Sequence, residues 1–577
     1  MCKSNLTQRL ACAVLACALA SLMSCSSQQS NPKASAENSE KEKTPLHKKL
    51  VSKLRRYDGV KGNLIEGVHP VHTVSNQEAI IPPMCYTRIE GKFNPCYVCH
   101  QNHDEGRENT MNDAELQTAY SFSDLGMTNH WSNLFKDRSA EVAAISDEEI
   151  RTWVDTDNYS NLAPRLKESG FKGWIPDLEN LQLAADAFDA NGFALDGSGW
   201  VAFNYKPLPS TFWPTNGSTD DVMIRLPMIF RTNLQGEASD DFYRANLAIV
   251  EANLKGYSEI SSLPINEKII GKDLNKDGKL SIIEKISNVD RYVGPAEKEY
   301  IDTFLYPEGT EFLHTVRYLG FTPKGEVTLS KRMKEVRYMR KWAAYRKEVY
   351  ERNYELEGFE KEAGNLPSYQ FLKDYGLDNG FGWSVQGFIE NVQGDLRVAT
   401  YEENLFCMGC HTSIGATIDK TISFPRKVDG AAGWGYINLK TMLDAPNRGE
   451  SKGEYATYLQ RVGGGGEFRS NPEMQERWFN KDGSLKENKI EAISSIYELI
   501  VPSPERALEL NKAYRVIVAE QSFIHGRDAT VTPPVNVHDF IDNETATTLP
   551  DHLMFDWDIR LDWNYKKNDS ANAVTLK

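Results

Sequence analysis

The pentapeptide Cys-x-x-Cys-His occurs twice in this chain of 577 residues, at positions 96–100 and at positions 407–411. In each copy the two cysteines are three residues apart, so one short turn places both sulfurs on the same side. The histidine that follows directly presents an imidazole beside them. Two copies of so restrictive a pattern do not arise by chance in a chain with 9 cysteines. The chain must therefore fold around two sites that each offer two thiols and one imidazole.

The first residues of the chain predict export. Lys3 and Arg9 precede an apolar run at residues 10–22, which is too short to span a bilayer and is typical of a secretory signal peptide. Residues 22–25 read Leu-Met-Ser-Cys, which resembles the lipobox of bacterial lipoproteins. This resemblance implies cleavage before Cys25 and lipidation of its thiol. The alternative is an ordinary signal peptide that is cut at a nearby small residue.

Both pentapeptides resemble the haem-attachment motif of c-type cytochromes, and the export signal fits that class. The resemblance covers these two sites and little of the remaining chain. It implies two molecules of haem c, each held by two thioether bonds and one axial imidazole. The residues that would supply these bonds are Cys96, Cys99, His100, Cys407, Cys410 and His411. Two other interpretations stay open, namely a zinc site and a pair of redox-active dithiols.

The second axial position of a haem decides between electron transfer and catalysis, because an open position admits peroxide or oxygen. His314 lies in an apolar stretch that would suit a haem pocket, and it is the histidine that we expect at this position. A histidine in such surroundings can equally be a satisfied core residue. Other candidates are His69, His72, His130, Met84, Met111, Met127 and Met442.

Residues 273–284 match the calcium loop of an EF-hand at every ligand position. The predicted ligands are Asp273, Asn275, Asp277, Lys279 through its carbonyl, Ser281 and Glu284. Gly278 stands where such a loop turns sharply, and we see no second loop. We therefore expect a permanently filled structural Ca²⁺ site rather than a sensor. The alternative is a solvated acidic turn without metal.

Charge and hydropathy exclude further classes of protein. The chain has 81 acidic and 66 basic residues, and its formal net charge of −15 becomes −15 − 2 = −17 once Lys3 and Arg9 leave with residues 1–24. We expect no nucleic-acid partner, because phosphate neutralisation needs a basic surface. No later segment is apolar and long enough to span a membrane, so attachment rests on the lipid. Cys85 has no assigned role, and a buried small hydrophobe is the favoured interpretation.

The caps and periodicities predict a mainly α fold with long irregular loops, organised as a multi-region cytochrome c-like protein. The predicted regions are a signal peptide at 1–24, a flexible tether at 25–60, an N-terminal haem region at 61–190, a middle region with the calcium loop at 191–330 and a C-terminal haem region at 331–577. Helices are expected after Ser146 and Ser503, and the longest helix over residues 330–363. Residues 221–226 carry a weak strand signal.

These features favour a lipid-anchored di-haem cytochrome that passes electrons between a redox partner and an acceptor at the bacterial cell envelope. Ser26 resembles the sorting signal for the outer membrane, where the protein would face the periplasm or the exterior. An alternative is a di-haem oxidative enzyme with unknown catalytic residues, because bacterial di-haem peroxidases also carry two such motifs and a calcium ion. This chain is longer, its motifs lie farther apart and its loop differs. A third possibility is an envelope scaffold or redox sensor.

Overall fold

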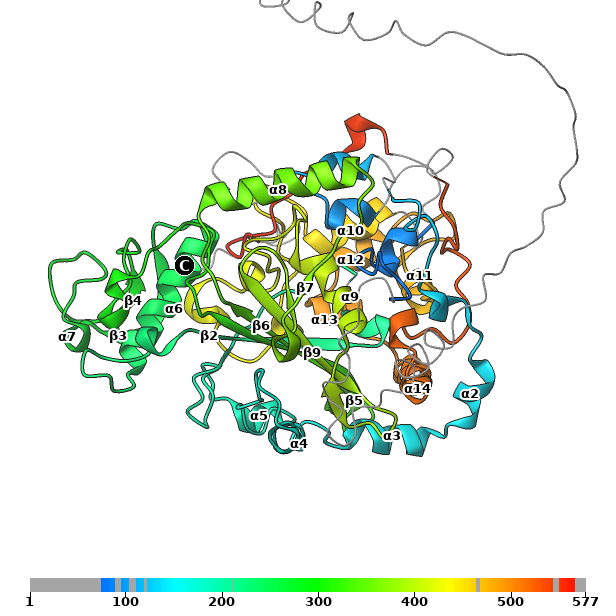
Figure 1. Cartoon of the computed structure of the whole chain (residues 1–577), viewed down its shortest axis with the longest axis horizontal. Helices are drawn as coiled ribbons and strands as arrows, with labels where there is room; N and C mark the ends of the chain where they lie inside the picture. The colour runs from blue at the N-terminus through cyan, green and yellow to red at the C-terminus, as the bar shows by residue number, and fades with distance from the viewer. Residues whose placement is uncertain are drawn as a thin grey trace, which may run out of the picture. The chain divides into compact units, whose positions relative to one another are not determined.

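The computed structural model describes residues 74–88, 95–102, 111–118, 122–210, 212–462, 467–542 and 549–565 (Figure 1). The predicted signal peptide, the tether and the lipidation site Cys25 lie outside the described residues. The helices are α2 Ser139–Ala144, α3 Asp147–Asp155, α4 Leu162–Ser169, α5 Ala184–Ala187, α6 Asp240–Lys255, α7 Glu267–Ile270, α8 Lys347–Glu362, α9 Tyr401–His411, α10 Glu454–Val462, α11 Pro472–Trp478, α12 Glu487–Glu491, α13 Ile496–Ile500 and α14 Pro504–Glu520. The strands are β1 Val201–Ala202, β2 Thr219–Arg225, β3 Ile260–Asn266, β4 Ile282–Ile286, β5 Glu311–Phe321, β6 Val327–Lys341, β7 Gln370–Phe371, β8 Leu377–Asp378, β9 Trp383–Glu390 and β10 Leu396–Val398.

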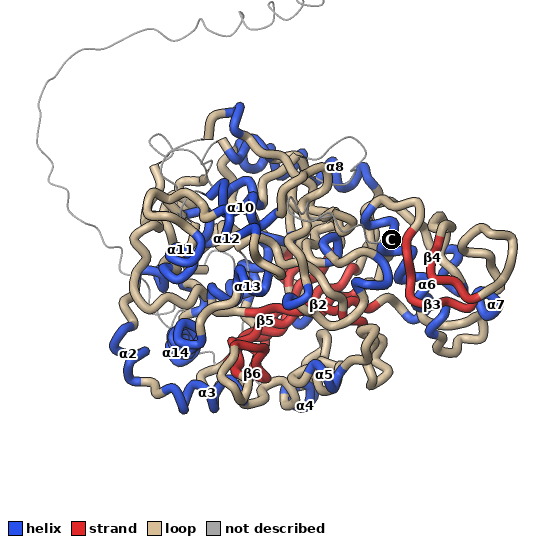
Figure 2. The backbone as a smooth tube through the Cα atoms, turned by 180° about the vertical axis from the view of Figure 1, so that it is seen from behind, coloured by secondary structure: helices blue, strands red, loops and turns tan. Residues whose placement is uncertain are grey.

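An antiparallel sheet of eight strands organises the described part of the chain. Its strand order is β1-β2-β5-β6-β9-β8-β7, and β10 pairs with β9. Figure 2 shows β2, β5 and β6 of this sheet in red. The prediction of a mainly α, cytochrome c-like fold is therefore wrong. The physical reason is burial, since every residue of β9 and almost every residue of β2 is buried. A strand that is covered on both faces loses the polar and apolar alternation by which a strand is detected in sequence.

The longest predicted helix, over residues 330–363, is half strand and half helix. Its first part belongs to β6, which pairs with β5 on one side and with β9 on the other. Only the second part is helical, as α8. Aromatic residues at Tyr338, Trp342 and Tyr345 have helical spacing by coincidence, because pairing on both edges of β6 decides its conformation.

Local sequence signals predicted three other elements correctly. Ser146 caps α3 by accepting a hydrogen bond from Glu149 N, and Ser503 caps α14 by accepting one from Arg506 N. The strand predicted at residues 221–226 overlaps β2 in residues 221–225, but it was predicted from residue pattern and not from a cap. The two helices depend on side chains within a few residues of their own ends, so the sequence alone is sufficient for them.

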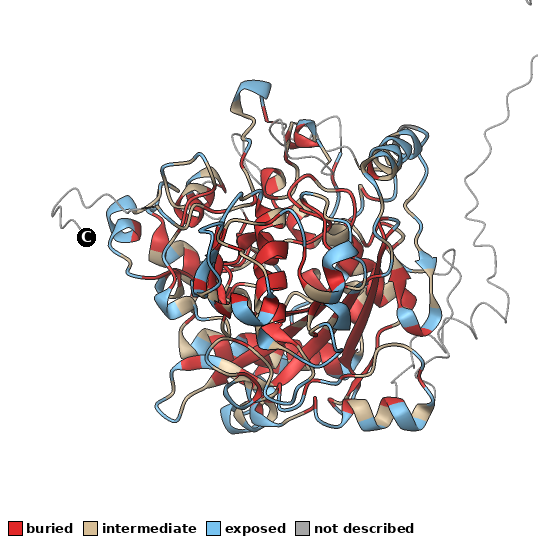
Figure 3. Cartoon of the chain, turned by 90° about the vertical axis from the view of Figure 1, so that its left-hand side faces the viewer, coloured by how far each residue is buried: buried red, intermediate tan, exposed pale blue. Residues whose placement is uncertain are grey.

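The central sheet has two faces of different character. One face carries apolar residues such as Met223, Leu313 and Val336, which pack with Leu166 of α4 in a buried cluster (Figure 3). Residues alternate across a strand, so His314 on β5 and Arg337 on β6 belong to the opposite face. The register places these two residues directly opposite each other. The second face therefore carries polar residues beside buried apolar ones such as Ile224, Phe312 and Met339.

Candidate functional site

The two Cys-x-x-Cys-His segments lie side by side, although residues 101–406 separate them in sequence. The amide of Ala416 donates to Cys99 O at 3.0 Å, and the amide of Gly415 donates to Asp113 Oδ1 at 3.1 Å. The other carboxylate oxygen of Asp113 lies 2.8 Å from His100 Nδ1. Asp113 is buried and thus joins the first motif to the segment that follows the second.

Two glycines permit this close approach of backbones. A Cβ atom at Gly409, which lies inside α9 between the two cysteines, would stand 2.4 Å from Ile80 O. A Cβ atom at Gly415 would stand 1.9 Å from Gln101 O. Both distances are far shorter than any van der Waals contact allows. Only glycine fits at these two positions. The backbone in and after the second motif therefore packs directly on Ile80 and Gln101, which lie before and after the first motif.

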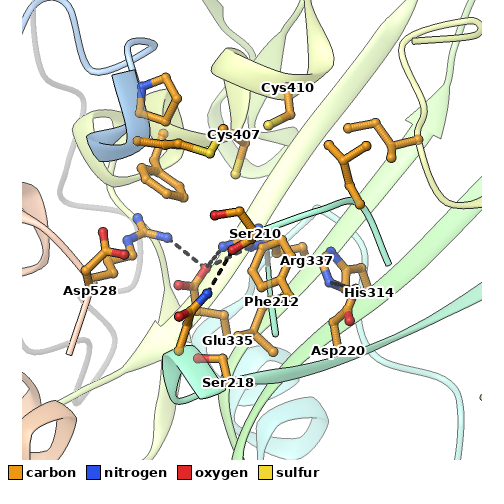
Figure 4. A pocket seen from close by; sticks show the side chains of 18 of the residues that line it. Ser210, Phe212, Ser218, Asp220, His314, Glu335, Arg337, Cys407, Cys410 and Asp528 are labelled. Carbon is orange, nitrogen blue, oxygen red and sulfur yellow. Dashed lines mark hydrogen bonds and ion pairs between the residues drawn. The ribbon is translucent and has the colours of Figure 1, made fainter. Parts of the chain in front are cut away.

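One cavity receives side chains from both motifs. It contains about 1450 Å³ of atom-free space, part of which is open to solvent. The predicted site residues that line it are Cys99, Cys407, Cys410, His411 and His314. Figure 4 shows Cys407 and Cys410 on the α9 side, opposite Arg337, Glu335 and Asp220. Cys96 and His100 are not among the lining residues, and of the other candidates Met84 lies in the wall.

All five cysteines of the described chain belong to this neighbourhood, and none of them forms a disulfide. Burial raises the pKa of the Cys96 thiol to about 12 and that of Cys410 to about 11. Burial also raises the pKa of Cys85 and Cys99, and proximity to Cys410 adds to both shifts. The thiols are therefore protonated at neutral pH. Cys85, left without a role by the sequence, is a member of this thiol cluster.

The imidazole of His411 has a fixed tautomer. Its Nδ1 atom donates to the carbonyl of Lys420 at 2.8 Å, which leaves the lone pair of Nε2 toward the cavity that His411 lines. Burial, with a smaller contribution from the nearby Arg337 guanidinium, lowers the pKa of His411 to about 4. The ring is thus neutral at pH 7.

A strained turn holds the carbonyl of Lys420 in place. Asp419 and Lys420 have φ values of 45° and 62°, which are costly for residues with a Cβ atom. The buried carboxylate of Asp419 accepts hydrogen bonds from four groups and so fixes this conformation. The four donors are Lys341 Nζ, Tyr350 OH at 2.8 Å, Trp383 Nε1 at 3.2 Å and Tyr306 N at 2.8 Å.

The sheet face that carries His314 and Arg337 forms the cavity wall opposite α9. Glu335 Oε2 accepts from Arg337 Nε at 2.8 Å and from Arg527 Nη1 at 2.7 Å. Although burial opposes ionisation, these two arginines hold the pKa of Glu335 at about 2. His314 Nε2 lies 3.5 Å from Asp220 Oδ2. The predicted residue His314 is thus at the cavity, with Asp220 as its neighbour.

A β-bulge occurs beside this wall. Val316 pairs with Glu335 and Arg317 pairs with Met333, so Lys334 is an extra residue in β6. Bulges re-aim side chains and are frequent next to functional sites. Here the bulge lets consecutive residues, Lys334 and Glu335, both line the cavity.

Sequence reasoning reached the cysteines and histidines of the cavity but missed its charged wall. The missed residues are Asp220, Lys334, Glu335, Arg337, Arg469, Arg527 and Asp528. They come from two strands and two later segments, so no spacing in the sequence links them. One usable signal was present, because charged residues inside a strand that is otherwise buried must pair or line a cavity.

The predicted calcium loop has a different architecture. It runs from α7 into strand β4, so it is not flanked by two helices, and the predicted ligand Glu284 is an exposed residue of β4. Asp273 and Asp277 accept hydrogen bonds from amides of the loop itself. Glu267 closes the loop, since its carboxylate accepts from Leu274 N at 2.6 Å and Ser281 N at 3.0 Å.

The prediction of two haem c groups and a calcium ion as cofactors is corrected accordingly. Among the residues that the structure describes, no group of three or more His, Cys, Asp or Glu side chains is placed to hold a metal ion. The acidic oxygens of residues 273–277 are used by backbone amides instead.

Comparisons with known proteins place the chain among lipoproteins. A family model whose description ends in "-like lipoprotein" matches residues 68–497. An uncharacterized lipoprotein of Aquifex aeolicus (strain VF5) is 33% identical over 559 residues, which covers 85% of this chain and 92% of the relative. No solved structure matches. Within the described ranges, none of the helices has the length and apolar character that crossing a membrane requires.

Proposed function

The chain belongs to this family of lipoproteins, and from that premise we propose that it is an exported, lipid-anchored redox protein that exchanges electrons with a partner at the cell envelope. The proposed anchor is Cys25, and Ser26 after it favours the outer membrane. The proposed redox groups are the sulfur atoms of Cys407 and Cys410 and of Cys96 and Cys99. The acceptor is a disulfide of a partner molecule.

The observation that carries this proposal is the cluster of five neighbouring cysteines, of which Cys99, Cys407 and Cys410 line one cavity. Neighbouring thiols do not persist unreacted in an oxidising compartment. When a Cys-x-x-Cys pair forms one S–S bond, its two thiols release two electrons and two protons. The partner disulfide takes up both and becomes two thiols, so atoms and electrons balance.

The electrostatics of the cavity assign different roles to the two cysteines of α9. Arg337 and Arg527 both favour the thiolate of Cys407, which opposes the effect of burial on its pKa. At Cys410 only Arg337 acts in this way. Cys407 is therefore the attacking thiol and Cys410 the resolving thiol. Because burial raises the pKa of both thiols, their thiolates are poor leaving groups when the S–S bond is attacked. The Cys407/Cys410 dithiol is therefore a strong reductant.

Intact-mass analysis with thiol counting tests the redox site. The protein is isolated from the envelope, blocked with iodoacetamide under denaturing conditions, and compared before and after reduction. We expect the Cys407/Cys410 pair to be blocked only after reduction, with a mass loss of two hydrogens for each S–S bond. Cys85→Ser serves as the matched control and keeps both pairs.

Two results would overturn this assignment. One is free reaction of all four motif cysteines before reduction. The other is a mass gain on these cysteines, which would mean that a covalently bound group, and not a disulfide, occupies the sulfurs. The anchor is tested separately, because Cys25→Ser should release the protein from the membrane fraction without changing its thiol count.

A further inference from the structure

Two buried arginines at the cavity share a single carboxylate. Arg337 and Arg527 both contact Glu335, and the side chains of the three residues are 11%, 8% and 5% exposed, respectively. One negative charge cannot neutralise two guanidinium groups. Since a buried charge without a counter-charge is costly, the triad lacks one unit of negative charge.

The other carboxylates of the cavity are already engaged. Asp528 accepts from Arg469 Nη2 at 3.2 Å, and Asp220 accepts from the hydroxyl of Tyr205. His314 stands beside Asp220, and the thiols of Cys407 and Cys410 face the triad from α9 (Figure 4).

A fourth basic residue faces the same cavity. Lys334 Nζ donates to Gly217 O and to Ser218 Oγ, and burial lowers its pKa to about 7. Lys334 is therefore only partly protonated at neutral pH. The other charged residues of the lining are Arg337, Arg469 and Arg527, with Asp220, Glu335 and Asp528.

Buried N–H groups without a hydrogen-bond acceptor indicate where an anion would bind. Arg527 donates from Nη1 to Glu335 and from Nη2 to Glu403 O, whereas its buried Nε atom has no hydrogen-bond partner among the described residues. Nη1 of Arg469 is buried and makes no hydrogen bond in the described chain, but it forms an ion pair with Glu467 Oε1 at 3.7 Å. Both arginines line the cavity. These N–H groups suit an acceptor with negative charge.

We propose that the cavity binds a small monoanion, a carboxylate or an inorganic oxyanion, at the guanidinium groups of Arg527 and Arg337. The anion supplies the missing counter-charge and accepts a hydrogen bond from Arg527 Nε. The site does not depend on the redox role of the sulfurs, and it is a binding function of its own.

Calorimetric titration of the purified protein with sodium acetate and with sodium nitrate, at constant ionic strength set with chloride, tests this site. We expect saturable binding of one anion per chain to the wild type. Removal of the charge in Arg527→Gln should weaken this binding about ten- to a hundredfold, since a charge-assisted hydrogen bond contributes about 1.5–3 kcal/mol and each 1.4 kcal/mol is a factor of ten. Arg340→Gln is the matched control, because Arg340 is an exposed residue of the same strand as Arg337.

A variant with the opposite expected sign protects the test against misfolding. Glu335→Gln removes the shared carboxylate, leaves both arginines uncompensated and should tighten anion binding several-fold. Equal affinity of the wild type, Arg527→Gln and Glu335→Gln would overturn the proposal, as would the lack of saturable binding by either anion. Thiol counting on the same samples keeps this outcome distinct from the redox assignment.

Discussion

The amide of Ala416 donates a 3.0 Å hydrogen bond to the carbonyl of Cys99, and this bond joins the ends of the two motif segments. The contact is possible because Gly415 leaves no Cβ atom between the two backbones. Neither motif segment is an independent site. The N-terminal segment forms part of the wall of the same cavity that α9 covers.

Asp113→Ala should destabilise the protein by about 2–4 kcal/mol, because the substitution leaves several buried donors unpaired. The carboxylate of Asp113 now accepts from Gly415 N, from Gln101 N and from His100 Nδ1. Urea unfolding monitored by fluorescence measures the change. Glu115→Ala, an exposed acid on the next turn, is the control and should be neutral. Equal stability of the two variants would contradict the bridging role.

Lys341→Met should lower the free energy of unfolding by about 3–5 kcal/mol, because it leaves the buried carboxylate of Asp419 without a counter-charge. Adding Asp419→Asn to this variant should restore part of the loss, because the buried charge is then removed. Arg340→Met, at the exposed neighbouring position, should change little. Thermal and urea unfolding of the wild type, Lys341→Met, Asp419→Asn and the double variant give the coupling energy. Additive losses would show that the pair does not hold the turn.

Glu467→Gln should stabilise the protein at pH 8 more than at pH 5. Burial raises the pKa of Glu467 to about 7, and neither carboxylate oxygen has a hydrogen-bond partner among the described residues. The folded protein thus binds a proton that the unfolded chain releases near pH 4.5, so wild-type stability falls as the pH rises from about 4.5 to 7. The difference between the two pH values should reach about 2–3 kcal/mol.

Unfolding experiments at both pH values measure this difference. Glu476→Gln is the control, since Glu476 is exposed on α11 and should show no such dependence. A stabilisation by Glu467→Gln that is the same at pH 5 and pH 8 would rule out the buried ionisation.

Glu267→Ala should open the loop between α7 and β4. The Glu267 carboxylate accepts from the amides of Leu274, Asn275 and Ser281, so its loss exposes these amides to solvent. Hydrogen exchange of residues 272–282 should become at least about tenfold faster, since lost protection of 1.4 kcal/mol is a factor of ten. Glu284→Gln, on the exposed side of β4, should leave exchange unchanged. The reverse pattern would restore Glu284 as the residue that closes the loop.

Sequence reasoning succeeded where the determinants are local. Ser146 and Ser503 predict the starts of α3 and α14, because a capping side chain binds a backbone amide within three residues. The Cys-x-x-Cys-His motifs and His314 were chosen by residue type as haem ligands; the structure places His314 and Cys407 at one cavity, and their role there stays a prediction. The two capped helices needed no knowledge of the sheet.

The charged residues of the cavity and the fold class could not be predicted, because both depend on how the strands pair. His314 faces Arg337 only because β5 and β6 adopt one particular register, which no pattern in either strand specifies. The sequence of β6 lacks the alternation of polar and apolar residues that is typical of a strand. The strand pairs on both edges and places charged side chains at a cavity. The loop at residues 273–284 matched a ligand pattern, yet Glu267, outside the pattern, closes it.

On the proposed export of the chain, the docking of the two motif segments also sets an order of events. If the N-terminus emerges first, Cys96 and Cys99 cross the membrane long before α9 exists to cover them. Contacts of such high sequence separation form late in folding. The first pair of thiols is therefore open to the enzymes of the compartment for most of translocation, whereas Cys407 and Cys410 are enclosed soon after they arrive. Any chemistry done to the first motif by another protein has a time window that the second motif lacks.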